Sequence, residues 1–254
     1  MILVVLSDIH ANLQALHAVL SHAGPDLARE GARLACLGDM VGYGADPQGV
    51  CDLLRPLNPL AVQGNHEAGV LDPAQVRHFN VLAWEAVEWT RDRLDAPTLD
   101  WLATLPRWAV LEGCRLVHGL PPDHLHPYLH QARPAALLRI FDGMRARGEH
   151  VGFVGHTHDL GLAYPDPACL DGVRMCALAP GVRALEQAHP WIVNAGAVGQ
   201  PRDGDPRAKY AVYDTASGRL DVRAVEYDAA EAARRILAAG LPEAYARRVL
   251  GDKR

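Results

Sequence analysis

Net positive charge, long apolar runs and paired cysteines are all missing from this chain of 254 residues. The net charge is -5, which argues against the broad basic face that a nucleic-acid polymer requires. No run approaches the ~18 consecutive apolar residues that predict a membrane-spanning helix. We therefore expect neither a nucleic-acid polymer nor a membrane as a partner. The fractions of hydrophobic (49%) and charged (22%) residues are those of an ordinary globular protein.

The cysteines give no sign of a disulfide framework. They are five in number and none form a C-x-x-C pair, so a reduced, intracellular protein explains them better. Cys36 and Cys114 lie in apolar stretches, where we expect buried core residues. The apolar start, MILVVL, is too short for a signal peptide and leads directly into Asp8, a candidate site residue. We expect a cytoplasmic location.

Helix-like and strand-like stretches alternate through the first two-thirds of the chain. Helices are predicted after Asn12, after Asp46-Pro47 and over about 134–147, and a single long helix is predicted after Asp72-Pro73. From about Val151 the pattern changes to strands: VGFVG, LGLAY, RMCALA, WIVNAG, KYAVYD and RLDVRAVEY. TASG predicts a hairpin turn between the last two. Asp228 and Glu231 predict a capping box for a closing helix.

These elements predict an α/β fold of two packed sheets with helices outside. Early strands separated by helices should be parallel, and the later run should add antiparallel strands. Because we find no repeat or linker, we expect one domain over 1–254, with a C-terminal hairpin and helical tail at about 209–254. Ligands in such folds gather at the carboxyl ends of the strands.

Residue types that bind metals follow or end several apolar stretches, at the predicted strand ends. They are Asp8, His10, Asp39, Asn65, His66, His118, His156 and His158. On extended segments, the pairs Asp8/His10 and His156/His158 would each point two side chains the same way. Mixed nitrogen and oxygen donors suit manganese, which we favour, or iron, zinc, nickel or cobalt. The donors exceed the needs of one ion, so two ions bridged by one carboxylate are expected.

Such a centre would carry out phosphate-ester chemistry. Two divalent cations outweigh Asp8, Asp39 and a bridging hydroxide, so the centre stays positive and attracts phosphate. The hydroxide would attack phosphorus, and His66 is the best candidate to protonate the leaving group as general acid. Taken singly, each histidine is more often a surface or hydrogen-bonded residue; the combination favours a metal site.

Five motifs, SDIHAN, GDMVGYG, GNHE, VHG and GHTH, resemble in order and spacing those of the calcineurin-like metallophosphoesterase superfamily, in particular its compact bacterial branch. The resemblance covers about residues 1–227. It implies a four-layer α/β sandwich of two mixed sheets flanked by helices. It further implies that Asp8, His10, Asp39 and His158 hold one metal, that Asp39 bridges to a second, and that His66 is the general acid. Asn65, His118 and His156 would complete the second metal's ligands.

The second motif departs from that of the superfamily's protein serine/threonine phosphatases. Those enzymes follow GD with a further Asp-Arg pair that supports the catalytic histidine and grips phosphate, where this chain has Gly42 and Tyr43. This favours a phosphodiester substrate, with a phosphomonoesterase (nucleotide or phosphoprotein phosphatase) as the alternative. A non-catalytic scaffold is a third hypothesis, disfavoured because all donors and His66 are retained. Besides Asn65 and His66, Arg202 is a candidate phosphate contact.

Other positions around the predicted site stay open. Glu67 and Asp159 adjoin site residues, and the sequence favours neither a role in orienting them nor the absence of such a role. His124, His126 and His130 are expected at a solvated rim rather than as ligands. Substrate choice should lie in the loops around 68–80 and 119–132, and the small phosphate ester itself is not disclosed. The sequence leaves the oligomeric state open.

Overall fold

A computed structural model describes residues 1–252, apart from the side chain of His78. It contains two six-stranded mixed sheets. The first has the order β3 (Leu60–Ala61), β2 (Arg33–Cys36), β1 (Ile2–Leu6), β11 (Ala208–Asp214), β12 (Arg219–Val225) and β9 (Gly181–Ala184). The second has the order β4 (Trp108–Leu111), β5 (Cys114–Val117), β6 (Val151–Val154), β10 (Trp191–Ala195), β7 (Leu160–Pro165) and β8 (Val173–Ala177).

The strand directions are those that the sequence predicts. β1, β2 and β3 run parallel, as do β5, β6 and β10, and helices lie between the early strands. The later strands β7, β8, β11 and β12 add antiparallel pairs, and TASG joins β11 to β12 as a hairpin. The short strands β4 and β9 were not predicted, because each carries several exposed residues and lies at a sheet edge.

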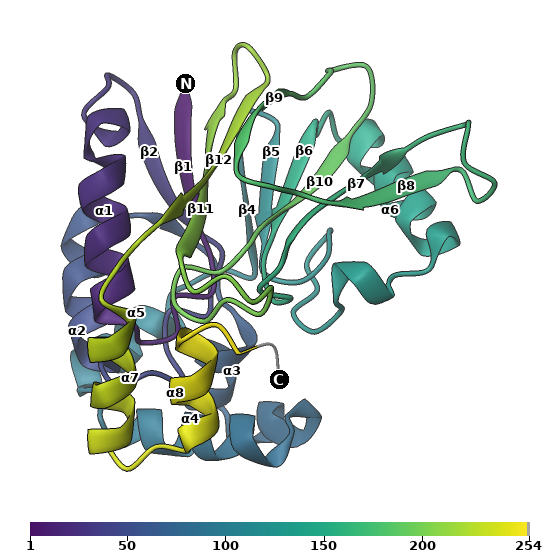
Figure 1. The fold of residues 1–254 in the computed structure, drawn as a ribbon. Coiled ribbons are helices and arrows are strands. Elements are labelled where there is room, and N and C mark those ends of the chain that lie inside the picture. Colours follow the sequence, from purple (N-terminus) through teal and green to yellow (C-terminus); the bar gives the residue numbers. More distant parts are fainter. Residues whose placement is uncertain (253–254) are drawn as a thin grey trace.

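The two sheets pack face to face with helices on both outer sides, giving four layers (Figure 1). Strand β1 shows why: Leu3 and Val5 enter the core between the sheets, whereas Val4 and Leu6 pack toward the helices. The first sheet is covered by α1 (Leu13–Leu27), α2 (Pro47–Leu54) and α5 (Ala96–Ala103). The second is covered by α6 (Pro134–Ala146). Cys36 and Cys114 are buried in these cores, as predicted.

Of three residues predicted at helix starts, two cap their helices and one does not. The Asn12 side chain accepts from the Ala15 N–H at 3.0 Å, which caps α1 as expected. Asp46 precedes α2 without capping it, and pairs instead with Arg235. Asp228 caps α7 (Ala229–Ala238), but the Glu231 carboxylate binds Arg234, so the capping box is only half formed.

The prediction of one long helix after Asp72-Pro73 is wrong. Asp72 caps a separate 3₁₀ helix, η2 (Pro73–His78), and the chain is extended at Phe79 (φ -88°, ψ 149°). Asn80 then caps α4 (Val81–Arg91) by accepting from the Ala83 N–H at 2.9 Å. A second capping residue within the apolar pattern therefore starts a new helix.

The remaining helices gather near the carboxyl ends of the strands. They are α3 (Asn65–Leu71), α7, α8 (Glu243–Val249) and the 3₁₀ helix η3 (Leu129–Gln131), whereas the 3₁₀ helix η1 (Arg55–Leu57) precedes the amino end of β3. α8 packs beside α4 in Figure 1, and the Tyr245 hydroxyl donates to the Leu82 carbonyl. Within residues 1–252, the structure has no helix of the length and apolar character needed to cross a membrane.

Candidate metal centre

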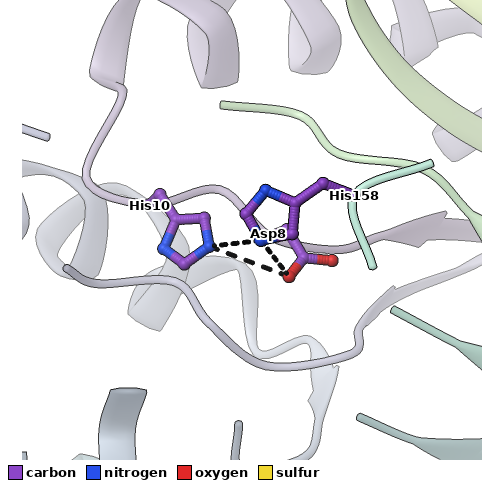
Figure 2. Close-up of side chains that lie close together, drawn as sticks. All are labelled: Asp8, His10 and His158. Carbon is purple, nitrogen blue, oxygen red and sulfur yellow. Dashed lines mark hydrogen bonds and ion pairs between the residues drawn. The ribbon is translucent and has the colours of Figure 1, made fainter. Parts of the chain in front are cut away.

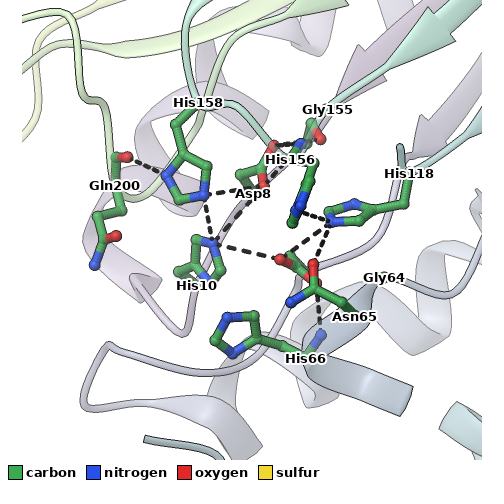
Figure 3. Close-up of polar contacts among 12 residues, drawn as sticks. Asp8, His10, Gly64, Asn65, His66, His118, Gly155, His156, His158 and Gln200 are labelled. Atoms are coloured by element: carbon green, nitrogen blue, oxygen red, sulfur yellow. Dashed lines mark hydrogen bonds and ion pairs between the residues drawn. The ribbon is translucent and has the colours of Figure 1, made fainter. Parts of the chain in front are cut away.

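The eight candidate residues come together at one end of the sandwich. Each lies where a strand has just ended, or at the start of α3, and none is more than 8% exposed. Polar groups buried this deeply are costly unless a hydrogen bond, an opposite charge or a metal ion compensates them. Figure 3 shows the side chains converging from both sheets. The structure therefore brings together residues up to 150 positions apart in the sequence, Asp8 and His158 among them.

The backbone reaches this arrangement by left-handed turns rather than by extended strands. Asp8, His10, Asp39, His156 and His158 all have positive φ, between 47° and 68°. The prediction that the Asp8/His10 and His156/His158 pairs lie on extended segments is therefore wrong. β1 ends at Leu6 and β6 at Val154, and the chain turns sharply beyond each strand. Such conformations cost roughly 1–2 kcal/mol per residue, and they concentrate at functional sites.

A first donor cluster consists of Asp8, His10 and His158 (Figure 2). His158 Nε2 lies 3.2 Å from Asp8 Oδ1 and 3.1 Å from His10 Nε2. His10 Nε2 is 3.8 Å from the same carboxylate oxygen. The other Asp8 oxygen accepts from the Ser7 hydroxyl at 2.7 Å. Three donor atoms therefore face one point.

A second cluster lies beside the first and shares a carboxylate with it. His118 Nε2 is 2.9 Å from Asn65 Oδ1, 3.2 Å from His156 Nδ1 and 3.2 Å from Asp39 Oδ2. The same Asp39 oxygen is 3.7 Å from His10 Nε2 of the first cluster. Asp39 therefore lies between the clusters, as a bridging ligand would.

Backbone carbonyls fix the orientation of the four imidazoles. His10 Nδ1 faces Val41 O at 3.1 Å, and His158 Nδ1 faces Gln200 O at 2.6 Å. His118 Nδ1 and His156 Nε2 likewise face the carbonyls of Leu37 and His126. Because a carbonyl oxygen can only accept, the neutral ring carries its proton on that side. The nitrogen facing the cluster then presents a lone pair, as metal-ligating histidines do.

The charges of these groups fit divalent cations. Burial lowers the pKa values of His10 and His158 well below the usual range, so both rings are neutral and two lone pairs face each other at 3.1 Å. A cation between them would turn that repulsion into attraction. In the second cluster, burial opposes protonation of His118, but Asp39 raises its pKa to about 9. A metal ion there would replace that proton.

The two carboxylates differ in their acidity. Burial raises the pKa of Asp8 to about 6. Burial also acts to raise the pKa of Asp39, but the neighbouring His118 outweighs it and holds that pKa well below its ordinary value. The site therefore combines two carboxylates, one amide and four imidazoles, a donor set suited to first-row divalent metals.

His66 lies at the cleft side of the clusters, and one of its ring nitrogens is within 4.8 Å of an Asp39 carboxylate oxygen and a His10 ring nitrogen. Its backbone N–H donates to Asp39 Oδ1 at 2.8 Å, while its buried Nδ1 has no hydrogen-bond partner. Burial lowers its pKa to about 4. Its ring packs on Tyr43, with centroids 4.5 Å apart. A Cβ at Gly42 would lie 2.1 Å from His66 Nδ1, so this position requires glycine.

Glu67, left open by the sequence, holds the ligand loops together. Its carboxylate accepts four backbone N–H groups: Gly64 at 2.8 Å, Asp39 at 2.8 Å, Met40 at 2.7 Å and Val41 at 3.2 Å. It thereby ties the loop after β2 to the start of α3. Asp159 differs, since it lines a separate cleft with Thr157 and Leu160.

A cleft of ≈ 250 Å³ opens onto the centre. It is lined by residues of both loops expected to govern substrate choice, Phe79 and Asn80 from one loop and His126 and Tyr128 from the other. Arg202 also lines it, as proposed from the sequence, and its buried Nε has no hydrogen-bond partner. His124 and His130 are exposed and do not line it, and His126 offers its carbonyl to His156.

Sequence reasoning missed four further cleft residues: Tyr43, Ala83, Arg248 and Asp252. Tyr43 lies within the motif GDMVGYG, and that position was the available signal. Arg248 is the second of two adjacent arginines on α8, and the sequence does not indicate which of the two faces the cleft.

Comparisons with known proteins agree with this geometry. The family model described as the calcineurin-like phosphoesterase superfamily domain matches residues 1–218. The uncharacterized protein MJ0912 of Methanocaldococcus jannaschii is 34% identical over 242 residues, covering 94% of this chain and 93% of that protein. A metallophosphoesterase from Sphaerobacter thermophilus is 37% identical, with a TM-score of 0.81 over 99% of each chain.

A more distant likeness bears on the fold alone. The hypothetical protein PH1004 from Pyrococcus horikoshii OT3 is 19% identical, with a TM-score of 0.74 over 100% of this chain and 98% of that one. Together with the family match and the two relatives above 30% identity, the motifs, the two-sheet fold and the paired donor clusters lead to one conclusion. This chain belongs to the calcineurin-like phosphoesterase superfamily, a metal-dependent family, and is a hydrolase of phosphate esters.

Proposed function

We propose that this chain hydrolyses a small phosphate ester at a centre of two divalent cations, with manganese as the favoured metal. The observation that carries the proposal is the position of Asp39 Oδ2, 3.7 Å from His10 Nε2 and 3.2 Å from His118 Nε2. Asp8, His10, Asp39 and His158 would hold one ion. Asp39, Asn65, His118 and His156 would hold the other. Two such ions supply Lewis acidity and a hydroxide nucleophile at neutral pH.

The protein's own groups have separate parts in this proposal. Asn65 and Arg202 would orient the phosphate in the cleft that both residues line. His66 would protonate the departing oxygen. Its pKa of about 4 leaves the free ring neutral at pH 7, and a bound phosphate anion would raise that pKa. We therefore expect His66 to gain its proton together with the substrate.

A phosphodiester is the first substrate class to test. Purified protein should hydrolyse an aryl phosphodiester when manganese is added, and elemental analysis should find two metal ions per chain. His66→Ala should keep the metal but lose at least ~100-fold in kcat, the usual scale for a general acid. Well-folded protein that shows no turnover on any aryl phosphate ester with any divalent metal would refute the proposal.

A phosphomonoester is the second candidate, and one observation favours it. Although the chain lacks the Asp-Arg pair, its cleft still has two guanidinium groups, because Arg202 and Arg248 both line it. A doubly charged phosphate is the form of substrate that gains most from two cationic side chains. Comparing kcat/KM for an aryl monoester and an aryl diester with the same leaving group distinguishes the two.

A further inference from the structure

Two arginines reach the rim of the cleft from distant parts of the chain. Arg202 belongs to the loop that follows β10, and Arg248 lies on α8. Both line the cleft that holds Asn65, His66 and His156. Both are half-buried, so neither guanidinium is simply a solvated surface group.

Fixed neighbours hold Arg248 in this position. On the same helix, Tyr245 is fully buried, donates to the Leu82 carbonyl and packs its ring on Tyr43 at 5.0 Å. Tyr43 in turn packs on His66. The helix is therefore anchored to the centre through two aromatic rings, and Arg248 is not on a loosely attached tail.

The two guanidinium groups influence each other. Burial lowers the pKa of Arg248, and the charge of Arg202 lowers it further. Two like charges brought together in a half-buried cleft repel each other, unless an anion lies with them. Asp252 is a carboxylate at the same rim and offsets part of this charge, while Asp39 belongs to the donor clusters. The unpartnered Arg202 Nε supplies a buried donor that an anion would satisfy.

We infer that Arg202 and Arg248 form an anion subsite that selects substrates carrying at least two negative charges on phosphate. This inference rests on the proposed function and adds the substrate class: a phosphomonoester, or an ester with a further phosphate group. Guanidinium groups suit phosphate because each presents several donors in a planar fork. The subsite lines the same cleft as Asp39, Asn65 and His156 of the donor clusters, so one substrate could contact both.

Enzyme kinetics test the subsite with one substitution and a matched control. Arg248→Gln should lower kcat/KM for an aryl phosphomonoester about tenfold more than for the aryl phosphodiester with the same leaving group. Arg248→Lys, which keeps the charge but not the fork, should recover part of the loss. Arg247→Gln is the control, because Arg247 is exposed on the same helix and pairs with Glu243 at 2.8 Å.

Equilibrium binding supplies a measurement that does not need turnover. Calorimetric titration of the metal-loaded protein with inorganic phosphate and with pyrophosphate should show about tenfold weaker binding in Arg248→Gln than in Arg247→Gln. A larger loss for pyrophosphate than for phosphate would indicate an ester with a further phosphate group. An equal loss would indicate a phosphomonoester.

The outcomes separate this inference from the proposed function. If Arg248→Gln lowers monoester and diester hydrolysis equally, or binds both anions as Arg247→Gln does, the subsite does not exist. If the unsubstituted protein hydrolyses no ester yet Arg248→Gln weakens anion binding, the subsite stands and the proposed function fails. Thermal melting of each variant shows whether a loss reflects misfolding. If Arg248→Gln is misfolded, Arg248→Lys, which retains the charge, replaces it in the comparison with Arg247→Gln.

Discussion

Replacing Glu67 by glutamine tests whether one buried carboxylate organises the metal-binding loops. In the structure, one carboxylate oxygen accepts the N–H groups of Asp39 and Gly64, and the other accepts those of Met40 and Val41. Glutamine has one acceptor oxygen, and its NH₂ group would face the other two N–H donors. Each buried donor left without a partner costs about 1–3 kcal/mol, so we expect a loss of roughly 2–6 kcal/mol in unfolding free energy.

This loss is large against the 5–15 kcal/mol that is usual for a folded protein. Burial raises the pKa of Glu67 to about 7, so the comparison belongs at about pH 8.5, where the carboxylate is charged. Urea unfolding, followed by circular dichroism in the presence of a chelator, measures the change without a contribution from bound metal. Glu88→Gln on the exposed face of α4 is the matched control and should change stability by less than about 0.5 kcal/mol. If Glu67→Gln behaved like that control, the assignment of Glu67 as an organising residue would be wrong.

Three further predictions follow from the site and its surroundings. Asp39→Asn should lose both metal ions by elemental analysis, whereas Asp8→Asn should retain the ion held by Asn65, His118 and His156; equal metal contents in the two variants would contradict a bridging Asp39. Gly42→Ala should lower kcat at least ~100-fold with metal retained, because its Cβ would displace His66, while Gly24→Ala, which meets nothing within 4 Å, should leave kcat unchanged. Burial opposes ionisation of Glu149, but Arg115 and Arg147 hold its pKa below 4.5. Its ion pairs therefore stabilise the fold fully above about pH 4.5 and are lost as the pH falls through that lower value. In Glu149→Gln the acid-side drop in melting temperature should be smaller; an unchanged pH profile would show that this pair contributes nothing.

Much of the site could be predicted because its chemistry lies in residue type and position along the chain. Asp8, Asp39 and His118 each follow a short, mainly apolar stretch that predicts a buried strand, and strand ends in such folds meet at one edge. Leu3, Val4, Val5 and Leu6 are all apolar, so the sequence predicts that both faces of β1 are buried. It does not tell which face packs on the other sheet and which packs on the helices. These signals lie within short segments of the sequence, so they can be recognised without knowing the tertiary contacts.

What could not be predicted depends on tertiary contacts. The left-handed turns at Asp8 and His156 follow from close crossings of distant loops, such as Gly155 against Ser7, which no single segment encodes. The break at Phe79 reflects a cap at Asn80 that competes with a continuing helical pattern. Arg248 points into the cleft because Tyr245 anchors its helix on Tyr43, a contact between segments about 200 residues apart.

The donors of each cluster come from both sheets of the sandwich. Asp8 and His10 follow a strand of the first sheet, whereas His158 follows a strand of the second, and Asp39 and His118 are divided in the same way. Ions bound here would clamp the two layers together, much as a covalent cross-link does. Metal binding would then stabilise the packing of the two sheets, and tighter packing of the sheets would in turn raise the affinity for metal. A cavity made far from the ions, for instance by Phe153→Ala between the layers, should weaken their binding without touching a single ligand.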